Sequence, residues 1–269
     1  MYASTGWNVY VFDFPGGTLV GQLGGFDQGF EKNGLCLDGA GDLFVTGWNH
    51  DSYKGQTYEF APGGQTPTAK LITGGVAHTC SVDPTTGNLA VAEIQDKLRD
   101  DHGAVAVFAG AQGDPTYDVD SETSSFRDCA YDSSGNLFIS QDYRGDLREL
   151  PHGSQSFATI ALNAGIVSGS LQWYGGELLV SSWTAKKSKD TIEQVEISGS
   201  TGTVVGTTVL ESKGRRRSVG QYVVDGDTIV GPGGSDKYIE FWNYPAGGEP
   251  TKNLGRGNPG NWQSVAISS

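Results

Sequence analysis

The sequence lacks the features of a membrane-spanning or nucleic-acid-binding chain. No run of about 18 or more apolar residues occurs, so we expect no membrane-spanning helix. Basic residues are scarce: 18 Lys and Arg stand against 31 Asp and Glu, a formal net charge of −13 over 269 residues. Nucleic acids and anionic lipid surfaces attract cationic proteins, so we expect neither as a partner. The one basic cluster, Lys213 to Arg217, is short and local.

Cysteine is also scarce. Cys36, Cys80 and Cys129 are an odd number, so they cannot all pair within one chain. Cys80 and Cys129 hold equivalent positions in the repeats described below, and Cys36 is shifted by one residue. Equivalent positions on neighbouring sheets are usually too far apart for a disulfide, whose Cα atoms must lie within about 7 Å. We therefore predict three buried thiols, and no Cys–His spacing indicates zinc.

Glycine, in contrast, is abundant, with 41 residues, whereas charged residues make up only 18% and aromatic residues reach 10%. Many turns, few long charged helices and many ring side chains are typical of an all-β protein. The segment from Met1 to Phe12 has no basic region or apolar core of a signal peptide and begins almost inside an expected strand. We expect that a native leader was removed.

A hairpin pattern recurs along the chain. In Asp128–Ser140 two short apolar runs flank a polar turn that contains Gly135 and Asn136. Thr79–Ala92 and Gly34–Thr46 repeat it, and Ser170–Ser181 and Gly220–Val230 are weaker copies. The second runs recur about every 41 to 50 residues, and a period in the forties made of short strands indicates propeller blades.

These repeats predict one domain, a six-bladed β-propeller with four-stranded antiparallel blades. The last segment, Ser264–Ser268, looks like a first strand without a second, and Tyr2–Leu23 looks like three strands without a first. Joined, they would form a seam blade from a C-terminal inner strand and three N-terminal strands. The expected blades are, approximately, residues 1–29 with 258–269, 30–75, 76–123, 124–166, 167–215 and 216–257.

The repeat resembles the NHL-type and related six-bladed propellers over essentially the whole chain. The resemblance rests on the strands GLCLD, CSVD and CAYD, on the GN or GD turns, and on the following LFV, LAV and LFI. It is similar to repeats in uncharacterised secreted or surface proteins of bacteria and, more distantly, to virginiamycin B lyase and gluconolactonase-like families. The resemblance implies architecture rather than activity, because propellers host many functions.

Enzymes among those families carry their functional groups at one mouth of the central channel, around magnesium or another divalent metal. The four histidines here, at positions 50, 78, 102 and 152, form no short His–Glu–His grouping. The residues expected to ring the mouth with metal-ligating side chains are Glu31, Asn33, His78 and Asp128. They could hold one divalent cation, Ca²⁺ or Mg²⁺, or pair with neighbours such as Lys32 and Arg127 instead.

Four of the six tryptophans are expected on the same face, three in the loops between second and third strands and Trp262 just before a first strand. Exposed Trp and Tyr among polar groups can bind a ligand by stacking and hydrogen bonds; alternatively, the rings pack loop against loop. The candidate ligand-binding residues are Trp7, Trp48, His50, Arg127, Tyr143, Trp183, Arg217 and Trp262.

The sequence thus favours a secreted or surface-exposed binding module, extracellular, periplasmic or on the cell surface, whose ligand is a small molecule, a glycan or a protein. We expect a monomer. The alternative function is a metal-assisted lyase or lactonase-type hydrolase at the channel mouth, so whether the chain is an enzyme stays open.

Overall fold

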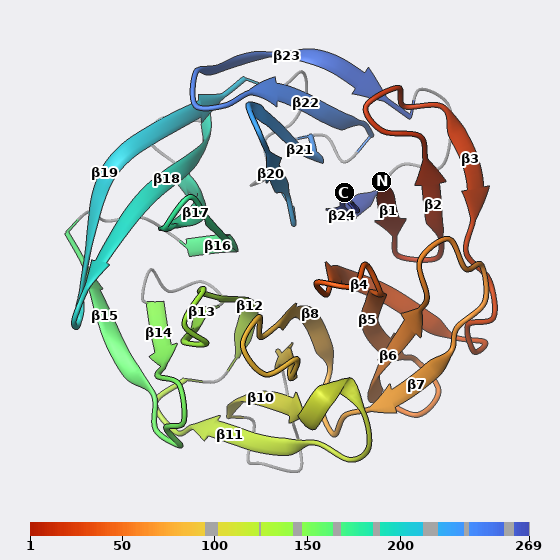
Figure 1. The fold of residues 1–269 in the computed structure, drawn as a ribbon, viewed down its shortest axis with the longest axis horizontal. Coiled ribbons are helices and arrows are strands. Elements are labelled where there is room, and N and C mark those ends of the chain that lie inside the picture. Colours follow the sequence, from red (N-terminus) through yellow and green to blue (C-terminus); the bar gives the residue numbers. More distant parts are fainter. Residues whose placement is uncertain are drawn as a thin grey trace.

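The computed structural model describes residues 1–94, 102–123, 125–141, 147–163, 168–184, 189–211, 220–233, 237–255 and 261–268. The chain is all-β: the described residues form strands β1 to β24 and one short 3-10 helix, η2 (Ala109–Ala111). Figure 1 shows the strands as successive sheets placed around a common centre, with both termini near that centre. No helix in the described ranges has the length and apolar character needed to cross a bilayer.

Three sheets have four strands each and are antiparallel. Their strands, in spatial order, are β24 (Trp262–Ala266), β1 (Tyr2–Thr5), β2 (Val9–Phe12) and β3 (Leu19–Gln22); β4 (Phe30–Leu37), β5 (Leu43–Asn49), β6 (Lys54–Phe60) and β7 (Ala69–Ile72); and β8 (Ala77–Val82), β9 (Leu89–Glu93), β10 (Gly103–Phe108) and β11 (Thr116–Asp120).

The other strands form three antiparallel meanders that touch at their outer strands. They are β12 (Phe126–Tyr131), β13 (Leu137–Gln141), β14 (Leu147–Leu150) and β15 (Ala158–Leu162); β16 (Ser168–Tyr174), β17 (Glu177–Thr184), β18 (Lys189–Ser198) and β19 (Thr201–Leu210); and β20 (Val223–Asp225), β21 (Thr228–Pro232), β22 (Ile239–Asn243) and β23 (Gly247–Leu254). The ten-residue β19 reaches both neighbours: Gly202 pairs with Leu162 of β15, and Leu210 pairs with Gly248 of β23, both in parallel.

The two ends of the chain share one sheet. The C-terminal strand β24 pairs antiparallel with β1, with Ala266 opposite Tyr2 and Ser264 opposite Ser4. The hydroxyl oxygens of Ser4 and Ser264 lie 2.5 Å apart in a buried hydrogen bond. The pairing predicted between the last strand and the first three strands is therefore present.

Consecutive apolar residues in the second strand of a sheet serve two different interfaces. In β5, Leu43 and Val45 pack in a cluster with Val9 of the preceding sheet, whereas Phe44 packs with Cys80 of the following sheet. Side chains alternate between the two faces of a strand, and both faces of this one are covered. This explains why the repeat reads LFV or LAV rather than alternating between apolar and polar residues.

Similar clusters join every neighbouring pair of sheets in the described residues. The last of these, in chain order, connects the final meander to the first sheet: Val230 and Phe241 pack with Phe12, Trp262 and Val265. Burial of these apolar side chains is the main stabilising contribution of the contacts between sheets.

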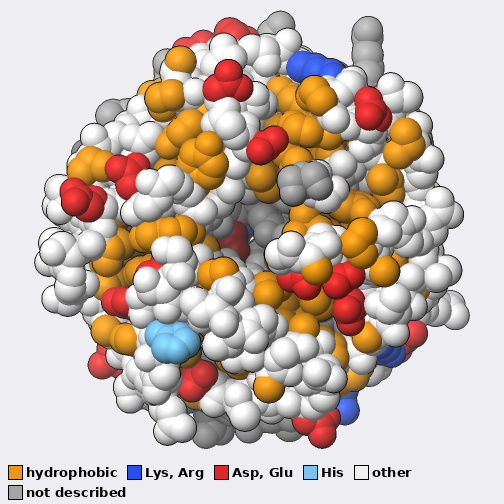
Figure 2. Space-filling view, in the orientation of Figure 1, with side chains coloured by type: hydrophobic (Ala, Val, Ile, Leu, Met, Phe, Trp, Pro, Cys, Tyr) orange, Lys and Arg blue, Asp and Glu red, His pale blue; other side chains and the backbone are white. Residues whose placement is uncertain are grey.

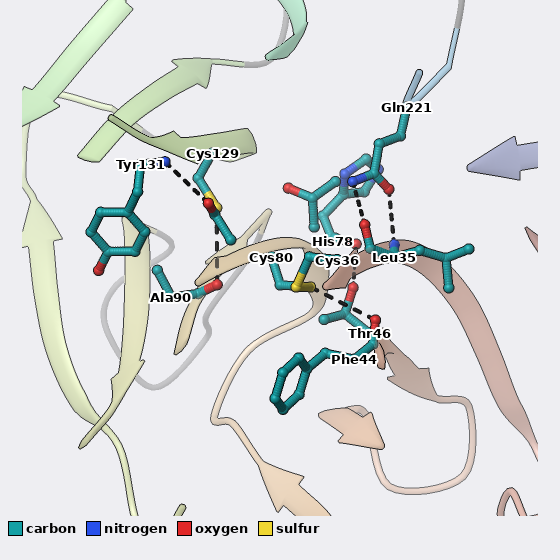
Figure 3. Close-up of a disulfide and its surroundings, with 12 residues drawn as sticks. Leu35, Cys36, Phe44, Thr46, His78, Cys80, Ala90, Cys129, Tyr131 and Gln221 are labelled. Carbon is teal, nitrogen blue, oxygen red and sulfur yellow. Dashed lines mark hydrogen bonds between the residues drawn. A yellow bond between two sulfur atoms is a disulfide. The ribbon is translucent and has the colours of Figure 1, made fainter. Parts of the chain in front are cut away.

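The prediction of three unpaired cysteines is wrong. Cys36 of β4 and Cys80 of β8 form a disulfide, with their Cα atoms 5.7 Å apart (Figure 3), whereas Cys129 is a buried free thiol. The two strands lie first in neighbouring sheets and approach closely, because Gly34 leaves room: a Cβ atom there would lie 2.6 Å from the carbonyl oxygen of His78. The first strands of neighbouring sheets come close together near the centre of the molecule. The separation assumed between equivalent positions on neighbouring sheets was therefore too large for these two cysteines.

Candidate functional site

A cluster of rings lies between the first two sheets. Glu31 of β4 is directly opposite Trp48 of β5 in the sheet register. His50 follows Trp48 by two residues and thus projects to the same side. The carboxylate, the indole and the imidazole therefore meet because of strand pairing and the two-residue period.

The rings in this cluster stack on one another. The imidazole of His50 stacks on Trp48 with centroids 4.0 Å apart and on Trp7 with centroids 5.6 Å apart. Tyr53 lies against Trp48 at 5.8 Å. We call Trp7, Trp48, His50 and Tyr53 the aromatic cluster. His50 Nε2 lies 2.6 Å from Oε2 of Glu31, and since a carboxylate accepts, this nitrogen carries the proton.

Two hydrogen-bonded turns hold the rings in place. In the β1–β2 turn, the hydroxyl of Thr5 accepts from the backbone N–H groups of Trp7 and Asn8. The loop after β5 is organised by Asn49, whose Oδ1 accepts from the N–H groups of Asp51 and Ser52, both at 3.0 Å.

Contacts outside these turns bind them to neighbouring segments. The N–H of Lys32 donates to the Gly6 carbonyl, which ties the first turn to β4. Asn49 Nδ2 donates to the carbonyl of Gln28. The aromatic cluster therefore stands on anchored turns rather than on free loop ends.

The aromatic cluster is open to solvent. Trp7 is 59% exposed and Tyr53 67% exposed, unusually high for such large rings. The side chain of His50 is 41% exposed and that of Glu31 is 27% exposed. Exposed rings beside a carboxylate can bind a ligand by stacking together with a charged hydrogen bond.

Of the eight candidate ligand-binding residues, the structure brings Trp7, Trp48 and His50 together. Trp262 does not join them: it is 4% exposed and packs against the rings of Tyr10 and Phe12, so the expectation of an exposed ring is wrong. Its position beside β1 puts it in the interface between the first and last sheets.

The remaining candidates lie elsewhere. Arg127 lies in a bulge of β12, and its carbonyl accepts from His78 and Thr79. Trp183 lies on β17. Tyr143 and Arg217 lie outside the described residues.

The four expected metal ligands each have a different partner. Glu31 bonds His50, Asn33 Nδ2 donates to the carbonyl of Ala77, and His78 Nδ1 donates to the carbonyl of Arg127. Within the described ranges no group of three or more His, Cys, Asp or Glu is placed to hold a metal ion. The divalent-cation site stays a prediction.

Asp128 lies in the interior rather than at an open mouth. It is 1% exposed, and its carboxylate accepts from the N–H groups of Cys129 and Leu171. Burial raises the pKa of Asp128 to about 6, although hydrogen bonds from Ser170, Thr79 and these two backbone groups act in the opposite direction. Asp128 thus connects β12 to β16.

Sequence reasoning missed Tyr53 as a residue of this region and placed Lys32 differently from the structure. Tyr53 follows His50 by three residues, and its φ of 56° turns the chain back into β6. Lys32 was expected to be a mouth residue, but it is 3% exposed, its Nζ donates to the carbonyl of Phe30, and it lies 4.4 Å from the centroid of the Phe26 ring. Burial lowers the pKa of Lys32 to about 8. The pattern WNHDSY could have indicated Tyr53, whereas nothing in the sequence indicates that Lys32 is buried.

Comparison with known proteins identifies the fold and nothing finer. No protein-family profile matches the chain. The comparison with curated proteins gives no match either. Among solved structures, a protein of unknown function from Bacteroides caccae matches with a TM-score of 0.71 and 13% identity, over 98% of this chain and 96% of that one. The β-propeller domain of Myceliophteria thermophila Cps50 (Swd1) matches with a TM-score of 0.63 and 13% identity, over 98% of this chain and 85% of that one.

The chain is therefore a β-propeller. At 13% identity, the likeness carries no residue roles from either structure to this chain.

Proposed function

We propose that this propeller is a binding module that recognises its ligand with the aromatic cluster. The observation that carries the proposal is the packing of four rings and one carboxylate into a single exposed group on two anchored turns. Trp and Tyr dominate the binding energy of many interfaces, because they bury a large area at a low conformational cost. A small molecule, a glycan or a protein could each provide a group that stacks there.

We propose further that the sheets are six four-stranded blades of one ring. The blades have the boundaries expected from the repeats, and the related group is that of the NHL-type propellers. The pairing of β24 with β1 and the apolar clusters between successive sheets support this. Figure 2 shows one face of the molecule, where hydrophobic and acidic side chains surround a central hollow.

The proposed location is extracellular, periplasmic or at the cell surface. The Cys36–Cys80 disulfide supports it, since disulfides form and persist mainly in oxidising compartments. The proposed state is a monomer.

The test is a screen of the labelled 269-residue chain on glycan and peptide arrays, followed by affinity measurements with the best ligand. Trp7→Ala should weaken binding by about tenfold or more, as expected for an aromatic hot spot. Leu19→Ala is the matched control, because Leu19 is similarly exposed, at 57%, on the same sheet. Equal affinities of the two variants would contradict a role for the aromatic cluster.

The divalent-cation site is tested separately. Thermal unfolding is followed with Ca²⁺ or Mg²⁺ against a sample treated with a chelator, since a ligand that binds only the folded state raises its stability. A saturable rise that is lost in His78→Ala would favour the metal-assisted hydrolase or lyase. Unchanged unfolding with both ions would count against it.

A further inference from the structure

His50 shows how the aromatic cluster holds a planar ring that carries N–H groups. Its imidazole stacks on Trp48 at 4.0 Å, with 28° between the planes, and on Trp7 at 5.6 Å, with 30°. At the same time its Nε2 donates to Oε2 of Glu31 at 2.6 Å. Stacking on an indole combined with donation to a carboxylate is the way in which a guanidinium group is recognised.

A guanidinium would satisfy this arrangement better than His50 does. It is planar and always charged, and its five N–H donors can reach both oxygens of a carboxylate, whereas the contact of His50 uses Oε2. The side chain of His50 is 41% exposed and begins the loop after β5, so it has room to rotate into solvent.

The surrounding charge favours a cationic ligand. The chain has a formal net charge of −13, and the carboxylate of Glu31 is hydrogen-bonded to His50 of the aromatic cluster. Two lysines lie next to the site in the sequence. Lys32, beside Glu31, packs with Phe26 and Phe30 of the core and donates to the carbonyl of Phe30. Lys54, beside Tyr53, is exposed at the start of β6. Asp51, also exposed, lies in the same loop as His50.

We propose that the aromatic cluster binds an arginine side chain of a protein partner. The guanidinium takes the position of the His50 imidazole, stacks on Trp48 and Trp7, and pairs with Glu31. His50 is then an internal competitor that fills the site in the free protein. This inference rests on the proposed function and names the ligand class of the same site.

The experiment is a titration of the ¹⁵N-labelled full chain with the blocked peptide acetyl-Gly-Arg-Gly-amide and with its citrulline twin. Citrulline has the same planar shape without the charge. The indole N–H resonances of Trp7 and Trp48, assigned with Trp→Phe variants, report binding. We expect saturable shifts with the arginine peptide. The citrulline peptide should bind at least about tenfold more weakly, because it lacks the positive charge that pairs with Glu31.

Three variants sharpen the test. Glu31→Gln should weaken arginine binding by about tenfold, whereas His50→Ala should strengthen it by roughly two- to tenfold because the competitor is removed. Glu249→Gln, an exposed carboxylate on β23, is the control and should bind like the wild type. Equal binding of the two peptides, no effect of Glu31→Gln, or weaker binding in His50→Ala would overturn the proposal.

The same resonances separate this proposal from the binding module itself. If a glycan or another array ligand shifts Trp7 and Trp48 while the arginine peptide does not, the module stands and the arginine site fails. If no ligand shifts either resonance, both fail.

Discussion

The side-chain amide of Gln221 pairs with the backbone of Leu35, 186 residues away, as a neighbouring strand would. Oε1 accepts from the N–H of Leu35 at 2.8 Å, and Nε2 donates to its carbonyl at 2.6 Å (Figure 3). Gln172 makes the same pair of bonds with Val224. The first strand of a sheet has an unpaired edge, and these amides satisfy backbone groups that would otherwise lose their hydrogen bonds.

Gln221→Ala should therefore lower the free energy of unfolding by about 1–3 kcal/mol, the cost of leaving a buried backbone group unsatisfied. The measurement is the urea midpoint at unchanged slope. Gln65→Ala, at an exposed position, is the control. If the two variants unfold at the same urea concentration, the pairing contributes nothing to stability.

The disulfide predicts the number of free thiols. In denaturant without reductant, a thiol reagent should detect one cysteine, Cys129, and after reduction it should detect three. The double variant Cys36→Ser with Cys80→Ser should lose about 4 kcal/mol of stability, since the bond closes a loop with a sequence separation of 44. Three thiols before reduction would show that the bond is not formed.

Gly34 should not tolerate a side chain. A Cβ atom would lie 2.6 Å from the carbonyl oxygen of His78 and 2.7 Å from the Cα of Thr79, and both are backbone atoms that cannot rotate away. Gly34→Ala should thus cost about 1–3 kcal/mol or more, as overpacking does. Gly39→Ala, with nothing within 4 Å of the added atom, is the matched control. Equal melting temperatures would argue against close contact between β4 and β8.

Asp128 should make the protein less stable as the pH rises, the opposite of what most carboxylates do. Its pKa is about 6 in the folded protein, raised by burial above the ordinary 3.8, so the folded state binds the proton more tightly. The contribution of Asp128 is then most favourable below about pH 4 and declines as the pH rises through 6, by roughly 3 kcal/mol in total.

The measurement compares wild type with Asp128→Asn by urea unfolding at several pH values. The difference between their stabilities should change between about pH 4 and 6 and level off above that. Asp114→Asn, at an exposed position, should show no such change. A constant difference for Asp128→Asn would mean that the folded pKa is ordinary.

Removal of Ser264–Ser269 should destabilise the protein far more than a terminal trim usually does. The deletion takes away three of the five residues of β24, among them the buried Val265, and the bond between Ser4 and Ser264. Losing such a buried side chain alone costs about 2–3 kcal/mol. Removal of residues 268–269 only is the control. A similar melting temperature for both truncations would show that the sheet does not depend on the C-terminal strand.

Part of the candidate site was readable from the sequence. Trp48 and His50 were expected close together, in the loop after a predicted strand, whereas the structure extends β5 to Asn49 and so sets both on one side. That Trp7 joins them depends on the hydrogen bond from Lys32 to Gly6, which brings two separate sheets together and leaves no local signal. Trp262 carries the same type of side chain as Trp7, yet it is buried, since its strand pairs with β1.

The strands, their turns and the apolar repeat could be predicted from the sequence, because they follow from the local conformational preferences of a few neighbouring residues and from the two-residue period of a strand. The contact between Cys36 and Cys80, the bonds from Gln221 to Leu35 and the burial of Asp128 became visible in the folded chain alone. These contacts depend on the distance between first strands that converge at the centre of the molecule. That distance is set by the packing of all the sheets together, which no short stretch of sequence records.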